Sequence, residues 1–214
     1  GEINRRLSLL KRHLPYHESD HILNLAFNYL TGGGRLQDIA LLRGDEAYLN
    51  ALGAETIPDP TTAGDFLRRF GSRDVLELMD IKNTIRQAVW QNQPKSFRKL
   101  ATLNVDGTIS PTWGQCKQGM EISYDGQWGY HPLVISLHQS REPLYIVNRP
   151  GNAPSHLDSP RWIDRSLAAN RRPDGLFHTY NLLQIDPDPT SDGTGFWACA
   201  GPAPGAARPT GCAP

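Results

Sequence analysis

The stretch Leu100-Ala-Thr-Leu-Asn-Val-Asp106-Gly-Thr108 decides how this chain is interpreted. Its apolar positions from Leu100 to Val105 are typical of a buried strand, and Asp106-Gly107 is expected to end that strand. A carboxylate at a strand end points out of a sheet edge, where divalent metal ions and phosphates often bind. Asp106 is therefore the first candidate for a functional acid, and its alternative role is a turn residue that caps a backbone amide.

The composition sets loose bounds on function. The chain has 214 residues, with 22 Lys+Arg and 22 Asp+Glu, so its net charge favours neither nucleic acid nor an acidic partner. No apolar run approaches the roughly 18 residues that cross a membrane, and no signal peptide is visible. The cysteines Cys116, Cys199 and Cys212 form no C-x-x-C pair, which indicates a reducing, cytoplasmic setting.

Residues 1–99 read as a helical region. Helices are expected at 19–30, 36–42 and 45–52, each closed by glycine, then after a Thr62–Asp65 capping box, and from Ser72 onward. Five arginines on these short helices fit a helix-turn-helix that binds DNA: Arg35, Arg43, Arg68, Arg69 and Arg73. The residues by themselves favour the alternative, a plain helical bundle with solvated arginines.

Residues 100–174 change character to strands. Residues 121–124 followed by Asp125-Gly126 predict one hairpin, and residues 132–137 and 143–147 predict a second. A helix is expected over residues 161–169. The predicted fold class is α/β (α+β), with a partial RNase H-like domain in which three antiparallel strands precede a helix.

Four motifs in this order resemble the DDE transposases of bacterial insertion sequences, and the IS1380-like group most of all. They are Leu103-Asn-Val-Asp-Gly-Thr108, Gly129-Tyr-His-Pro-Leu133, Asn148-Arg-Pro-Gly-Asn152 and Trp162-Ile-Asp-Arg165. The resemblance covers roughly residues 15–170 and includes parts of the helical region. It implies DNA strand cleavage and transfer at the ends of an insertion sequence.

The resemblance also implies a metal site. In this family three carboxylates hold two divalent ions, usually Mg²⁺, and Asp106 matches the first carboxylate by position. Asp174 fits the letters of the second motif, Arg172-Pro-Asp-Gly-Leu-Phe177, but no apolar strand precedes it and Pro173 disfavours one. The third acid is normally a Glu on a later helix, whereas no Glu follows Glu142. Three later acids remain as substitutes: Asp186, Asp188 and Asp192.

Residues 175–214 read as a Gly/Pro/Ala-rich tail without regular structure. They contain no Lys and a single Arg, Arg208, and show no periodicity of 2 or 3.6. We hypothesise that this tail is translated out of the ancestral frame or past an interruption, so that the chain is truncated relative to the family.

Two functional hypotheses follow. The first is a transposase with insertion-sequence terminal repeats as its DNA partner, acting as a homodimer in the bacterial cytoplasm, associated with the nucleoid and not with a membrane. The second is a catalytically inactive transposase remnant that retains at most DNA binding.

Overall fold

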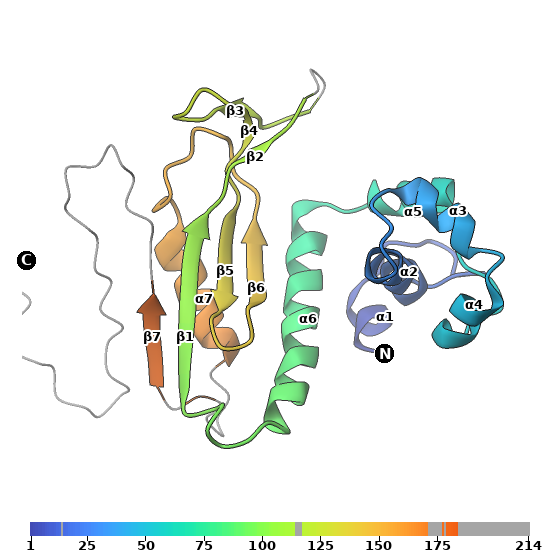
Figure 1. The fold of residues 1–214 in the computed structure, drawn as a ribbon, viewed down its shortest axis with the longest axis horizontal. Coiled ribbons are helices and arrows are strands. Elements are labelled where there is room, and N and C mark those ends of the chain that lie inside the picture. Colours follow the sequence, from blue (N-terminus) through green and yellow to red (C-terminus); the bar gives the residue numbers. More distant parts are fainter. Residues whose placement is uncertain (14, 114–116, 171–176, 178, 184–214) are drawn as a thin grey trace, which may run out of the picture. The chain divides into compact units, whose positions relative to one another are not determined.

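The computed structural model describes residues 1–13, 15–113, 117–170, 177 and 179–183 (Figure 1). The chain divides into two compact units, residues 1–85 and residues 86 onward. The division falls inside one long helix, α6 (Ser72–Gln91), earlier in the chain than the predicted boundary after residue 99. Each unit is described by itself.

Helices make up the described part of the first unit, in agreement with the sequence. They are α1 (Glu2–Arg6), α2 (Glu18–Leu30), the short 3-10 helix η1 (Leu36–Asp38), α3 (Ile39–Leu42), α4 (Glu46–Leu52), α5 (Pro60–Leu67) and the first part of α6. Their apolar core is centred on Ile39, Tyr48, Ile57 and Ala63. Short helices of this kind are stable only because they pack against one another.

The helix ends follow local sequence signals, with one correction. Asp45 caps α4 by accepting a hydrogen bond from the amide of Tyr48, and Gly53 ends that helix in the left-handed conformation (φ 63°). The predicted Thr62–Asp65 capping box is wrong. Asp59 is the N-cap of α5 and accepts from the amides of Thr61 and Thr62, because Pro60 supplies the first helical residue.

Helix α2 buries polar side chains. Its buried residues are Glu18, His21, Asn24 and Asn28, whereas Tyr29 and Leu30 are exposed. Glu18 accepts hydrogen bonds of 3.0 Å from the amides of Leu9 and Leu10, and the His21 ring stacks on Phe66 at 4.4 Å. Hydrogen bonds and ring stacking therefore hold this helix in place, in addition to apolar burial.

The second unit contains a four-stranded sheet. Its order is β6-β5-β1-β7, from β1 (Leu100–Gly107), β5 (Leu133–Leu137), β6 (Glu142–Val147) and β7 (Thr179–Leu183). β5 is antiparallel to both β1 and β6, and helix α7 (Ser159–Asn170) follows β6 (Figure 1). Three antiparallel strands followed by a helix is the predicted arrangement, so the mixed fold class is confirmed.

One face of this sheet forms the core. The register pairs Leu103 with Leu137, Val105 with Ile135 and Gly107 with Leu133, so these side chains share a face. The leucines, the valine and the isoleucine of this set are at most 1% exposed. Tyr145 lies on the same face and its ring contacts Trp162 of α7 at 5.6 Å, so α7 covers this side.

A second, smaller sheet lies between β1 and β5 in the sequence. Its order is β2-β4-β3, from β2 (Ser110–Pro111), β3 (Glu121–Ile122) and β4 (Trp128–Tyr130). β3 and β4 form the hairpin predicted from Asp125-Gly126, and Gly126 has the positive φ (79°) that such a turn favours.

Strand β7 corrects one expectation. The sequence predicts no regular structure after residue 174, but residues 179–183 form a strand parallel to β1, pairing Leu100 with Thr179 and Asn104 with Leu183. This expectation is wrong for these residues because a short edge strand gains its order from the neighbouring strand and carries little local pattern.

No helix among the described residues has the length and apolar character needed to cross a membrane.

Candidate functional site

Asp106 lies at the exposed end of the acid-bearing strand. It is opposite Val134 in the register, and its neighbours Val105 and Gly107 face the core, so the Asp106 side chain points to the other face of the sheet. Asn104 shares that face, and its Nδ2 lies 3.4 Å from Nδ1 of His138. The exposed face therefore offers one carboxylate together with an amide and an imidazole.

Gly107 explains why glycine follows the acid. The prediction that Asp106-Gly107 ends the strand is confirmed, because β1 ends at Gly107, which pairs with Leu133. A Cβ at Gly107 would clash with Nε2 of His131 and would lie 3.2 Å from Nη2 of Arg149. Glycine is required here by close side-chain packing, and its φ is not positive.

Arg149 is buried behind this strand end, with 5% of its surface exposed. Its Nε donates to the carbonyl oxygen of His131 at 3.0 Å, and its Nη1 donates to the carbonyl oxygens of Pro154, Ser155 and Leu157. Burial lowers the pKa of Arg149, and the charge of Asp158 opposes that effect. One guanidinium therefore joins the start of β5 to the loop that leads into α7.

His131 is the second buried polar side chain at this place. Its Nδ1 lies 2.6 Å from the carbonyl oxygen of Ala153, so Nδ1 carries the proton and donates. Its backbone amide donates to the carbonyl oxygen of Arg149 at 3.0 Å. His131 thus fixes the same loop as Arg149, which agrees with a structural role.

The motif glycines bring three distant sequence segments together. A Cβ at Gly129 would clash with the carbonyl oxygen of Ser110, and one at Gly151 would clash with that of Glu121. Tyr130 and Pro150 form an isolated antiparallel bridge. The Asp106, Gly129 and Asn148 motifs therefore pack against one another at one end of β1. We name Gly107, His131 and Arg149 the strand-end cluster.

The second predicted acid, Asp174, lies outside the described residues. β7 starts at Thr179 beside Leu100, the end of β1 remote from Asp106, and its last pair joins Leu183 to Asn104. The last described residue of β7 thus lies toward the Asp106 end of β1.

The fit to a metal ion is partial. The Asp106 carboxylate is a hard oxygen donor at an exposed strand end, which suits Mg²⁺. Within the part of the chain that the structure describes, no group of three or more His, Cys, Asp and Glu side chains is gathered to bind a metal ion. The described residues thus place one candidate acidic ligand at this strand end.

All five predicted DNA-binding arginines lie in the first unit and are exposed: Arg35, Arg43, Arg68, Arg69 and Arg73. Arg35 and Arg43 flank η1 and α3, whereas the other three lie in or just after the turn between α5 and α6. Arg68 forms an ion pair with Asp65. The α5–turn–α6 segment has the order of a helix-turn-helix.

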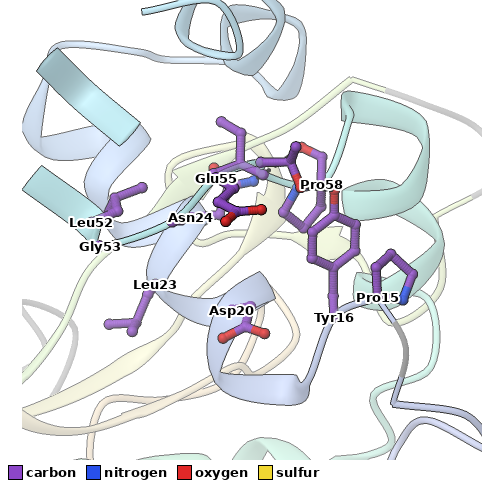
Figure 2. A pocket seen from close by; sticks show the side chains of 12 residues that line it. Pro15, Tyr16, Asp20, Leu23, Asn24, Leu52, Gly53, Glu55 and Pro58 are labelled. Carbon is purple, nitrogen blue, oxygen red and sulfur yellow. Dashed lines mark hydrogen bonds between the residues drawn. The ribbon is translucent and has the colours of Figure 1, made fainter. Parts of the chain in front are cut away.

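A pocket of about 430 Å³ lies in the first unit, between α2 and the segment after α4 (Figure 2). Its charged lining residues are Asp20 and Glu55. Tyr16, Leu23 and Asn24 also line it. Because the lining carries acids and no Lys or Arg, it does not suit a DNA phosphate.

The sequence predicts a structural role for His131 before Pro132, but it does not reveal the role of Arg149. A buried guanidinium that bonds to backbone carbonyls depends on long-range packing. The signal that could have revealed this role is the pair of glycines, Gly107 and Gly151, since glycine inside a strand or beside a buried motif often marks close approach.

The comparisons with known proteins agree with the motifs. The sequence model of the family described as Transposase DDE domain group 1 matches residues 8–174, which is more than half of the chain. That span contains Asp106 and the strand-end cluster and ends before β7. No match was found among the curated proteins or among the solved structures. The chain belongs to the transposase DDE domain family, whose members act on DNA and generally use divalent metal ions.

Proposed function

We propose that this chain has transposase-type activity, cleaving and transferring DNA strands at the ends of an insertion sequence of the IS1380-like group. The observation that supports the proposal is the exposed Asp106 at the end of β1, inside the span that matches the DDE family. Terminal repeats are the proposed DNA partner, and a homodimer is the proposed acting form.

The proposed chemistry assigns Asp106 as the first acid. Mg²⁺, when bound, would activate a water or a DNA 3′-hydroxyl and stabilise the charge of the attacked phosphate. Asp106 would hold the ion, and its exposure leaves room for the substrate oxygen beside it. The buried strand-end cluster lies on the opposite face of β1, so it has no part in binding the phosphate.

Asp174 is proposed as the second acid, because it fits the letters of the family's second motif. Asp186, Asp188 and Asp192 are proposed as substitutes for the third acid, which in this family is normally a Glu. Asn variants of Asp174 and Asp186 test these two assignments.

DNA binding is proposed for the five exposed arginines of the first unit. Each arginine that neutralises a phosphate adds to the salt dependence of binding, whatever the base sequence. Arg68 already pairs with Asp65, so we expect Arg35, Arg43 and Arg73 to contribute more.

A nicking assay with Mg²⁺ and insertion-sequence end DNA tests the proposal. The intact chain should nick the DNA, Asp106→Asn should abolish nicking, and Asp164→Asn, an exposed acid on α7, should not. Nicking lost in Asp174→Asn would support it as the second acid, and nicking lost in Asp186→Asn would support it as a substitute for the third. Nicking that persists in Asp106→Asn would reject the proposed role of Asp106.

The second candidate function is a non-catalytic remnant that binds DNA. The observation that favours it is the set of five exposed arginines in the first unit, whose binding of phosphates needs no metal site. This candidate predicts a salt-dependent shift of end DNA with no nicking at any Mg²⁺ concentration.

A further inference from the structure

We propose that Arg149 is a positioning residue for Asp106 and acts through the backbone of Gly107. The inference rests on the proposed function, because it takes Asp106 as the acid that the reaction uses. Three observations carry it: the carbonyls that Arg149 joins, its unpaired nitrogen, and the face of β1 on which it lies.

Arg149 holds together segments that are separate in sequence. Its Nε bonds to His131, just before β5, and its Nη1 donates to three carbonyls in the loop before α7, of which Leu157 is the nearest at 2.9 Å. A lysine has one compact ammonium and no planar fork, so it cannot make this set of bonds with the same geometry.

The remaining nitrogen of Arg149 points to the acid-bearing strand. Nη2 is buried and has no hydrogen-bond partner, and the position of a Cβ on Gly107 lies 3.2 Å from it. Leaving a buried donor unpaired costs free energy, more so when the group is charged. The hydrogen bonds of Nε and Nη1 make Arg149 a structural residue, and Nη2 is the nitrogen that they leave unused beside β1.

The supporting side chains and the proposed catalytic acid lie on opposite faces of β1. Side chains alternate along β1, so Gly107 faces the strand-end cluster and Asp106 faces the opposite side. Nε2 of His131 and Nη2 of Arg149 thus fill the space in which a side chain on Gly107 would lie, on the face opposite Asp106. A shift in this support would reorient the Asp106 carboxylate while leaving the DNA-binding arginines of the other unit untouched.

Arg149→Lys tests the inference, with Arg86→Lys as the matched control. Arg86 is also an arginine with a largely buried side chain, and its Nε bonds to Glu142 at 3.0 Å, on another part of the same unit. Both variants keep the charge and lose a planar fork, so both should lower the thermal midpoint of the intact chain. Measurements are compared at temperatures where the two variants are equally folded.

Only Arg149→Lys should disturb the strand end. We expect faster amide hydrogen exchange at Asp106 and Gly107 than in Arg86→Lys, because the backbone loses its support. Where the wild type nicks DNA, the rate should fall roughly 10- to 100-fold, as expected for a misplaced catalytic group. The dissociation constant for DNA should stay within about twofold of the wild type, because ground-state binding is retained.

A double-mutant cycle tests the route through Gly107. Gly107→Ala displaces His131 and Arg149 without changing either side chain, and its effect on exchange should overlap with that of Arg149→Lys. Equal exchange at Asp106 and Gly107 in Arg149→Lys and Arg86→Lys, or strict additivity in the cycle, overturns the inference. If the wild type does not nick DNA, the proposed function is overturned. The hydrogen-exchange comparison then still decides whether Arg149 supports the strand end.

Discussion

Helix α2 and strand β1 bury opposite kinds of side chain. β1 places Leu103 and Val105 in the core and leaves Asp106 exposed, as alternation along a strand requires. α2 instead buries Glu18 and Asn24 and leaves apolar side chains at the surface. Apolar burial therefore holds β1 in place, whereas α2 depends strongly on hydrogen bonds. The two regions should respond differently to mutation and to pH.

The largest effect is expected from Leu103→Ala in β1. Leu103 is fully buried, so the free energy of unfolding of the second unit should fall by about 2–5 kcal/mol. Urea titration followed by circular dichroism measures it. Ile146→Ala, at a residue 47% exposed on β6, is the control and should cost much less. Equal losses for the two variants would contradict an apolar core on this face.

A smaller effect is expected from Glu18→Leu in α2. This change leaves the amides of Leu9 and Leu10 without their acceptor, at a cost of roughly 1–3 kcal/mol. Glu18→Gln keeps an acceptor oxygen and should cost less. Chemical denaturation of the first unit compares the two, and a Leu variant as stable as the wild type would show that the buried carboxylate does not hold this helix.

Cap variants sharpen the comparison further. Asp59→Ala removes the N-cap of α5 and should lower the thermal midpoint by roughly 2–5 °C. Asp65→Ala, which removes the residue that the sequence wrongly assigns to a capping box, should leave the midpoint nearly unchanged. A larger drop in the thermal midpoint for Asp65→Ala than for Asp59→Ala would instead support the Thr62–Asp65 capping box.

The smallest effect is a pH dependence of the first unit that comes from His21. Burial lowers the pKa of His21 below its ordinary value of 6.5, so the unfolded chain binds more protons and stability falls as the pH drops below 6.5. His21→Phe keeps the stack on Phe66 and should remove this loss between pH 6.5 and 4.5.

The loss at lower pH has another source. Burial raises the pKa of Glu18, but hydrogen bonds from Leu10 and Leu9 outweigh it and hold the pKa below 4.5. The stability from Glu18 is thus present above pH 4.5 and lost as the pH falls through its folded value. Thermal midpoints across pH separate the two residues, and an unchanged profile in His21→Phe would contradict the role given to His21.

The sequence predicted the strands better than the contacts between them. The hairpin of β5 and β6 was predictable because alternation and a polar turn are local signals. Strand β7 was not predictable, because its order depends on pairing with β1. The N-cap Asp59 was not predictable either, because Pro60 moves the start of the helix.

The candidate site shows the same limit. Asp106 could be singled out from its strand and its motif, and the structure places it at an exposed strand end, while its role as a metal ligand stays a prediction. The cluster of Gly107, His131 and Arg149 could not be predicted, because their contacts join residues far apart in the chain. Asp174 and the other later acids stay predictions.

The most direct test of the central claim is Mn²⁺ binding to the intact chain, followed by electron paramagnetic resonance. The wild type should bind Mn²⁺, and Asp106→Asn should weaken binding by at least about tenfold, because a hard cation loses a carboxylate ligand. Glu121→Gln, at an exposed acid on β3, should bind as the wild type does. Equal Mn²⁺ binding by Asp106→Asn and the wild type would contradict the assignment of Asp106 as the metal-binding acid.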